Sequence, residues 1–254
     1  MAFASYPSLR DRVVLITGGG SGIGASITEH FCAQGARVAF IDIAVEASRA
    51  LVEAVRGRGH SAPLFIECDL RDIASLRAAV ARVERELGPV RALINNAARD
   101  DRHDWKAVTP AYWDETQDVN LRHQFFALQA VAPGMAAAGG GSIVNFGSIS
   151  WQRKTTGMVG YTTAKAAIQG LTTVMARELG PQNIRVNSIM PGATRTERQV
   201  TKWWSEEMIA RFRREQCLDT LVEPPDIARM ALFLAADDSR AITAQSFKVD
   251  AGLS

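Results

Sequence analysis

Hydrophobic positions along the chain follow two alternating patterns. Short continuous apolar runs predict buried strands. Between these runs, apolar residues recur every three or four positions, as at Ile168, Leu171 and Met175, and this spacing predicts helices. The expected strands are 12–17, 37–42, 64–70, 92–96, 142–146, 184–190 and 246–250. The expected helices run through Ile27 and Phe31, through Leu51 and Val55, and over 73–87, 109–135, 161–179 and 225–236.

This alternation predicts an α/β protein. Parallel strands joined by helices need right-handed crossovers, which place helices on both faces of the sheet. We therefore expect one doubly wound, Rossmann-type domain over residues 1–254, with a seven-stranded parallel sheet. No shift in composition marks a second domain, and the stretch 194–220 is expected to be irregular or short-helical.

Composition narrows the functional classes. The net charge of +2 gives no electrostatic support for binding nucleic acid or a membrane surface. No apolar run is long enough to span a bilayer, and the N-terminus has no secretory h-region. The three cysteines are scattered, which fits a reducing, cytoplasmic compartment. The four histidines have no metal-ligand spacing, so we expect no metal.

A glycine-rich loop joins the first expected strand to the first expected helix. Gly18, Gly22 and Gly24 allow a tight turn, a close approach to a diphosphate and close packing of helix on strand. The helix N-terminus supplies N–H groups and a positive dipole end for the phosphates. The spacing is Gly-x-x-x-Gly-x-Gly, and its position inside a βαβ unit indicates a nucleotide site.

Asp42 ends the second expected strand, 24 residues after Gly18. An acid at this place accepts hydrogen bonds from the hydroxyls of an adenosine ribose. Its charge repels a 2′-phosphate, and neither Ile43 nor the glycine loop supplies a basic partner. The sequence therefore favours NAD over NADP.

Tyr161 and Lys165 lie four residues apart on an expected helix, so both side chains share one face. Ser148 follows the apolar run that precedes this helix. A hydroxyl at a strand end, a phenol and an amine can together form a proton-transfer site. Tyr-x-x-x-Lys by itself is a short pattern that an ordinary helix surface also produces.

The motifs in combination resemble those of the short-chain dehydrogenase/reductase family. The matching residues are Thr17, Gly18, Gly22, Gly24, Asn95, Asn96, Ala97, Asn120, Ser148, Tyr161, Lys165, Pro191 and Gly192, in the family's order and over essentially the whole chain. The resemblance implies that Tyr161 is the catalytic acid/base and that Lys165 binds the nicotinamide ribose and lowers the pKa of Tyr161. It further implies that Ser148 holds the substrate oxygen and that Asn120 positions a water that relays protons.

The same resemblance implies a set of NAD-binding residues. They are Gly18, Ser21, Gly22, Ile23, Gly24, Asp42, Ile43, Asp69, Leu70, Asn96, Ala97, Tyr161, Lys165, Pro191, Gly192, Thr194 and Thr196. Three positions depart from the family pattern, because Ala98, Ala244 and Ala251 stand where glycine is usual. A methyl group at these points is expected to crowd the backbone.

A narrower resemblance concerns the substrate. The segments 6–9, 100–103, 120–123, 130–135 and 146–151 are similar to those of bacterial NAD-dependent aldose 1-dehydrogenases of the D-xylose type. This resemblance implies oxidation of an aldose at C1 to a lactone, with 194–220 as a substrate lid. Flat apolar faces and amides suit a sugar. The expected substrate residues are Ser148, Ser150, Gln152, Arg153, Tyr161 and Trp204.

Two alternatives remain open from the sequence. Arg153 and Lys154 are cations just beyond Ser148 and could bind a carboxylate, which favours a sugar-derived hydroxy or keto acid such as a 2-keto-3-deoxy sugar acid. A non-catalytic NAD-binding sensor is the alternative of another class, although both Tyr161 and Lys165 are present. The helices over 109–135 and 161–179 resemble the dimer-forming faces of the family, which implies a homotetramer.

Overall fold

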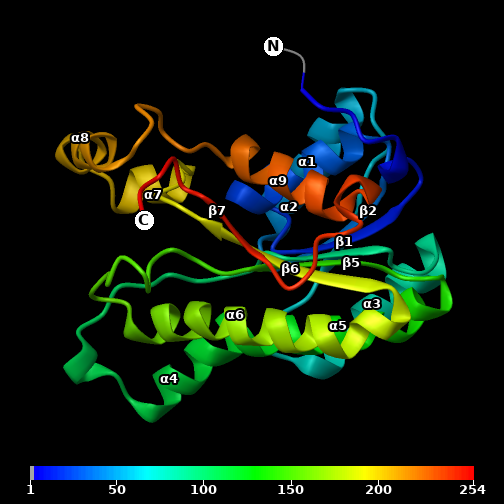
Figure 1. Cartoon of the computed structure of the whole chain (residues 1–254), viewed down its shortest axis with the longest axis horizontal. Coiled ribbons are helices and arrows are strands. Elements are labelled where there is room, and N and C mark those ends of the chain that lie inside the picture. The colour runs from blue at the N-terminus through cyan, green and yellow to red at the C-terminus, as the bar shows by residue number, and fades with distance from the viewer. Residues whose placement is uncertain (1–2) are drawn as a thin grey trace.

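The computed structural model describes residues 3–254 and forms one seven-stranded parallel sheet covered by helices on both faces (Figure 1). The strand order is β3-β2-β1-β4-β5-β6-β7. The strands are β1 (Val13–Thr17), β2 (Arg37–Asp42), β3 (Leu64–Glu67), β4 (Ala92–Asn95), β5 (Gly141–Phe146), β6 (Ile184–Pro191) and β7 (Ser246–Val249). The predicted fold class and all seven predicted strands are confirmed.

Strand residues divide between the two faces of the sheet. Val14 and Ile16 of β1 pack into one core, whereas Val13 and Leu15 pack into the other. This division follows from the alternation of side chains along a strand. Because both faces are buried, the central strands need continuous apolar runs, and these runs are what the sequence contains.

The helices form two layers. Helices α1 (Gly22–Ala33), α2 (Val45–Gly57) and α9 (Pro224–Ala235) lie above the sheet in Figure 1, and α1 packs on α9. Helices α3 (Ile73–Leu87), α4 (Pro110–Gln117), α5 (His123–Ala137) and α6 (Val159–Leu179) lie below it. No helix among residues 3–254 is long and apolar enough to span a membrane.

We expected one continuous α-helix over 109–135, and this prediction was wrong. A π-helical turn, η3 (Asp118–Arg122), separates α4 from α5. The backbone stays in the right-handed helical region on both sides, so the helix continues in direction but gains a wider turn. Asn120 lies in that turn, and its Nδ2 donates to the carbonyl of Thr116 at 3.0 Å. Such turns often occur at functional sites.

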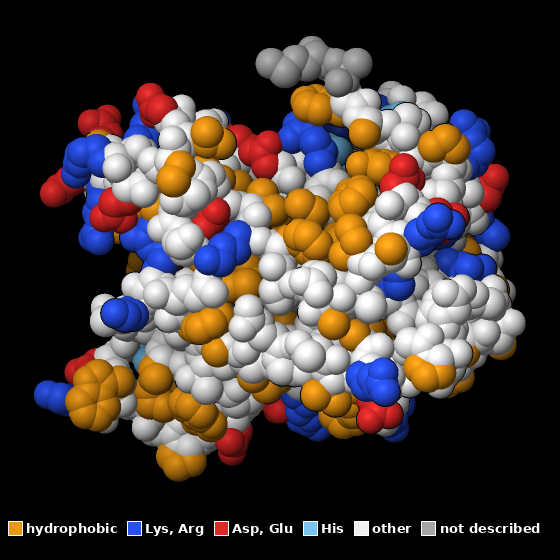
Figure 2. Space-filling view, viewed as in Figure 1, with side chains coloured by type: hydrophobic (Ala, Val, Ile, Leu, Met, Phe, Trp, Pro, Cys, Tyr) orange, Lys and Arg blue, Asp and Glu red, His pale blue; other side chains and the backbone are white. Residues whose placement is uncertain are grey.

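The lid stretch is short-helical, as predicted. It contains α7 (Glu197–Lys202) and α8 (Glu206–Glu215), which lie beyond the carboxyl ends of the strands, at the left of Figure 1. Figure 2 shows charged side chains gathered over this part of the molecule. The lid therefore faces the edge of the sheet where doubly wound folds bind ligands.

Candidate active site

A cleft of about 1060 Å³ runs along the carboxyl ends of the strands. The strand order reverses between β1 and β4, and this is the point at which open α/β sheets bind ligands. All seventeen residues predicted to bind the cofactor line the cleft. The lining spans the glycine loop, the ends of β2 and β4, α6 and the loop after β6.

The glycine loop is held in a fixed shape by polar contacts from neighbouring strands. Asp42 accepts hydrogen bonds from the backbone N–H groups of Gly20 at 2.8 Å and Ala44 at 2.9 Å. The Asn96 side chain donates to the carbonyl of Gly18 at 2.9 Å. These contacts fix the loop beside the N-terminus of α1, a helix end of the kind that can bind a diphosphate.

Two of the glycines leave no room for a side chain. A Cβ at Gly24 would lie 1.8 Å from the carbonyl oxygen of Gly18, and a Cβ at Gly18 would lie 2.7 Å from the Cα of Ala97. Gly18 also has a positive φ of 65°. The close packing of strand, loop and helix therefore depends on glycine, and the resulting cradle fits a dinucleotide.

Tyr161 and Lys165 share one face of α6, as predicted. Tyr161 lies in the first turn of α6, and Lys165 Nζ is 5.7 Å from the centre of its ring. Lys165 is only 1% exposed, and its Nζ donates to the carbonyl of Phe146 at 2.8 Å. Ser148 follows β5, and its Oγ accepts a hydrogen bond from the Ser150 N–H at 3.1 Å.

Burial acts on both groups of this pair. It raises the pKa of Tyr161 to about 12, against the opposing effect of a hydrogen bond with Ser148. It also lowers the pKa of Lys165 to about 7. Both shifts favour the neutral forms, because desolvation disfavours a charge on either group. An added positive charge beside Tyr161 would favour its ionised form.

Asn120 is placed differently from its expected role. Its side chain is 1% exposed and does not line the cleft among the described residues. The Oδ1 atom accepts from the Arg99 N–H at 2.9 Å, and Nδ2 donates to the Arg99 carbonyl at 3.1 Å. Asn120 therefore holds the loop after β4 through its side-chain amide, and its expected role in positioning a water stays a prediction.

Four of the predicted substrate residues line the substrate end of the cleft. Ser148, Ser150, Tyr161 and Trp204 line it. Ser150 Oγ is buried without a hydrogen-bond partner in the described part of the chain, so it is free to meet a substrate hydroxyl. Trp204 packs edge-on against Phe212, with ring centres 5.3 Å apart.

Two predicted substrate residues are placed differently. Gln152 does not line the cleft formed by residues 3–254. Arg153 lines the cleft, and its guanidinium lies 2.5 Å from Glu215 Oε2 on α8. A guanidinium engaged by a carboxylate of its own chain is less available to a carboxylate on a substrate.

Several lining residues were not predicted individually. They come from the lid, from the loop after β4 and from the C-terminus, and include Asp100, Arg198, Gln199, Met208, Phe212 and Leu253. The stretch 194–220 was expected to be a substrate lid, but no spacing along the chain indicates which side chains turn inward. No cluster of three or more metal-ligating side chains occurs within residues 3–254.

Comparisons with known proteins agree with this geometry. A family model described as Enoyl-(Acyl carrier protein) reductase matches residues 18–254. A solved short-chain type dehydrogenase/reductase from Mycobacterium ulcerans superposes with a TM-score of 0.91 at 29% identity, covering 98% of this chain and 91% of that one. The chain belongs to the short-chain dehydrogenase/reductase family, and is an oxidoreductase of CH–OH groups that uses a nicotinamide cofactor.

Particular relatives are similar over nearly the whole length. A protein named "Probable galactose dehydrogenase" from Rhizobium meliloti (strain 1021) is 53% identical over 250 residues, which is 98% of each chain. A D-xylose 1-dehydrogenase from Caulobacter vibrioides (strain NA1000 / CB15N) is 49% identical over 252 residues, 99% of each. A 7α-hydroxysteroid dehydrogenase complexed with NADH superposes with a TM-score of 0.92 at 30% identity, covering 99% of this chain and 98% of that one.

Proposed function

We propose that the protein oxidises an aldose at C1 to the corresponding lactone, with NAD as the hydride acceptor. The observation that carries this choice is the pairing of Arg153 with Glu215, because it engages one of the two cations expected to hold a sugar acid; the other, Lys154, also lines the cleft. What remains near Tyr161 includes the Ser148 and Ser150 hydroxyls and the Trp204 ring, which suit a neutral polyol. The two relatives named for galactose and D-xylose support the same choice.

The proposed chemistry divides between the chain and the cofactor. When bound, NAD supplies the hydride acceptor and a positive charge beside the phenol. Tyr161 takes the proton from the anomeric hydroxyl as the C1 hydride leaves, so that C1 becomes the lactone carbonyl. Ser148 hydrogen-bonds the same oxygen and fixes its direction. Lys165, anchored on the Phe146 carbonyl, holds charge next to Tyr161.

The preference for NAD rests on the adenosine end of the cleft. The Asp42 carboxylate lines it and would repel a 2′-phosphate. Arg71 also lines this end but is engaged by two carboxylates, at 2.6 Å from Asp69 and 2.7 Å from Glu115. A guanidinium held in this way is not free to bind a 2′-phosphate. Both features support NAD.

The location and assembly of the protein form part of the same proposal. Cys32 and Cys68 are buried free thiols whose pKa values are raised by burial, which suits a reducing cytoplasm. Helix α6 exposes Val174 and Val159 on the side away from the sheet, which supports association into a homotetramer. Sedimentation as a monomer would contradict the assembly.

The test is a comparison of substrates. We expect NADH to form, followed by its absorbance, with pentoses and hexoses as substrates and NAD in preference to NADP. Sugar acids and 2-keto-3-deoxy acids should give little turnover. Turnover of acids alone would replace the aldose proposal with the sugar-acid alternative. Turnover of neither, with NADH still bound, would favour the sensor.

A further inference from the structure

Asp100 is the one carboxylate of its loop that both lines the active-site cleft and contacts the lid. It lies in the loop after β4, and its side chain is 18% exposed. Neither its spacing nor its neighbours in the sequence mark it as a functional residue. Its position between the lid and the catalytic helix α6 sets it apart from Asp101, which does not line the cleft among the described residues.

The lid attaches to this loop through polar contacts on α7. Asp100 Oδ2 accepts a hydrogen bond from Gln199 Nε2 at 2.8 Å, and Oδ1 lies 3.2 Å from the Arg198 guanidinium. The Arg102 guanidinium adds a cation–π contact with Trp203, 5.4 Å from the centre of the ring. The first helix of the lid is therefore fixed over the cleft by one short segment.

Contacts with α4 and η3 in turn hold this segment of the loop after β4 in place. Arg99 is bonded to Glu115 of α4 at 3.1 Å and to Asp101 at 2.6 Å. The side chain of Asn120 bonds both backbone polar groups of Arg99. Because the loop is fixed on the sheet side, breaking its contacts with α7 moves the lid and leaves the loop in place.

Asp100 also acts on the catalytic pair through its charge. Its carboxylate raises the pKa of Tyr161 and of Lys165, while Arg102 lowers that of Tyr161. The charged and titratable groups around Asp100 are Arg198 on α7, Tyr161 and Lys165 on α6, and Asp101 and Arg102 of its own loop.

We propose that Asp100 is a positioning residue that receives the lid through Gln199 and Arg198 and so holds α7 over the substrate end of the cleft. Loss of this carboxylate would release the first helix of the lid from the loop after β4, while the loop itself stays fixed. The substrate would then be held less firmly beside Tyr161.

The first test uses the free chain and needs no activity. Limited trypsin digestion, with cleavage after Lys202 mapped by mass spectrometry, reports lid opening. Asp100→Asn should speed this cleavage about fivefold, because a charge-assisted contact between loop and lid is lost. Asp101→Asn is the comparison variant: it loses a contact with Arg198 at 3.1 Å but keeps the bond between Gln199 and Asp100, and so should speed cleavage less. Equal rates for the two variants, or no increase for Asp100→Asn, would overturn the role in holding the lid.

The second test measures kcat and KM separately and rests on the proposed function. Asp100→Asn should raise KM for the aldose more than it lowers kcat, because the lid then covers the substrate less often. A fall in kcat with KM unchanged would overturn the role in holding the lid over the substrate. If the wild-type chain oxidises no aldose, the proposed function fails, while the trypsin result still decides the role in holding the lid.

Discussion

At the scale of single residues, burial decides the chemistry of the site. Tyr161 and Lys165 are each shifted towards their neutral forms, since desolvation disfavours a charge on either one. The spacing of four residues predicted that they share a face of one helix. It could not predict their protonation in the free protein, because that depends on how deeply α6 is covered by the lid and by the loop after β4.

We predict that oxidation depends on Tyr161 in a pH-dependent way. Because its pKa lies near 12 in the free protein, the neutral phenol dominates below that pH, and kcat/KM for oxidation should rise with pH. Tyr161→Phe should lower kcat by a factor of about 10² to 10⁴ or more, the range typical of general acid–base groups. Binding of NADH, measured by fluorescence titration, should stay nearly unchanged.

Tyr112→Phe is the matched control for that experiment. Tyr112 bonds His103 at 2.8 Å and does not line the cleft formed by residues 3–254, so its loss should leave turnover near that of the wild type. Turnover by Tyr161→Phe within about tenfold of wild type would remove Tyr161 as the base.

Three alanines stand where the family usually has glycine, and they show how far the sequence predicted backbone strain. Ala244 and Ala251 have φ values of 61° and 54°, in the left-handed region where a methyl group costs about 1 kcal/mol. Crowding was expected at both, and the structure contains it. Ala98 was grouped with them but has no positive φ. A missing glycine indicates strain only where the local turn requires a positive φ.

At the scale of elements, the strands and their connections were predictable, and irregular turns were not. The apolar runs and the glycine loop fixed the seven strands and the first βα unit. The π-helical turn at Asp118–Arg122 carries no proline or glycine, so nothing in its composition distinguishes it from the α-helix around it. It arises from tertiary contacts of Asn120 with the loop after β4.

We predict that the first βα unit depends on Gly24. Gly24→Ala places a methyl group against the Gly18 carbonyl, and overpacking of this kind costs about 1–3 kcal/mol. Thermal unfolding should show the loss, and NADH binding should weaken because the phosphate loop is displaced. Gly57→Ala, at the end of α2 with nothing within 4 Å of the added methyl, should leave both measurements near wild type. Wild-type NADH binding by Gly24→Ala would contradict the assigned cradle.

At the scale of the whole molecule, the site is a product of topology. Strand order reversal between β1 and β4 opens the cleft, and the lid covers it from residues that lie late in the chain. The contacts that shape the substrate end join distant segments: Gln199 reaches Asp100 across 99 positions, and Arg153 reaches Glu215 across 62. No local pattern along the chain encodes such pairs, so the sequence did not predict that Arg153 contacts Glu215.

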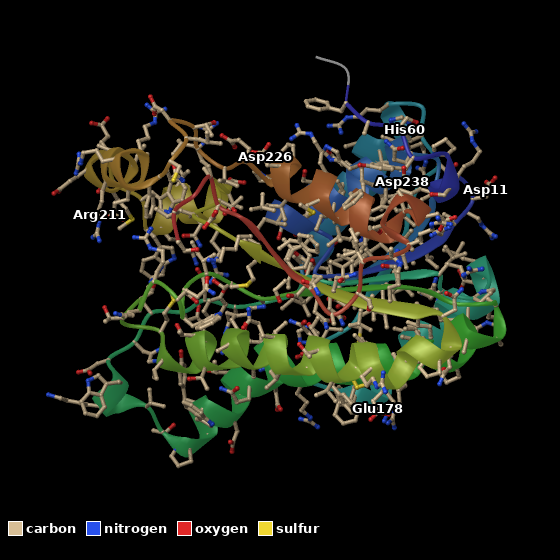
Figure 3. The ribbon with its side chains drawn as sticks, in the orientation of Figure 1. Asp11, His60, Glu178, Arg211, Asp226 and Asp238 are labelled. Carbon is tan, nitrogen blue, oxygen red and sulfur yellow. The ribbon has the colours of Figure 1, made fainter. Side chains whose placement is uncertain are left out.

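The lid also determines the charge that a substrate meets. Figure 3 shows Arg211 projecting from α8, and its guanidinium lies 2.7 Å from Glu215, which also binds Arg153. The shared carboxylate is thus held between two cations, and its pKa is lowered by both. This arrangement engages both Arg153 and Arg211 within the chain, which fits the proposed uncharged sugar.

The most direct test of the account follows the hydride itself. D-galactose and D-xylose, each deuterated at C1, are incubated with the wild-type chain and NAD, and both products are analysed by mass spectrometry and NMR. We expect one deuterium in the reduced cofactor and a lactone without the label. Unlabelled NADH, with deuterium retained at C1 of the oxidised sugar, would contradict oxidation at the anomeric carbon.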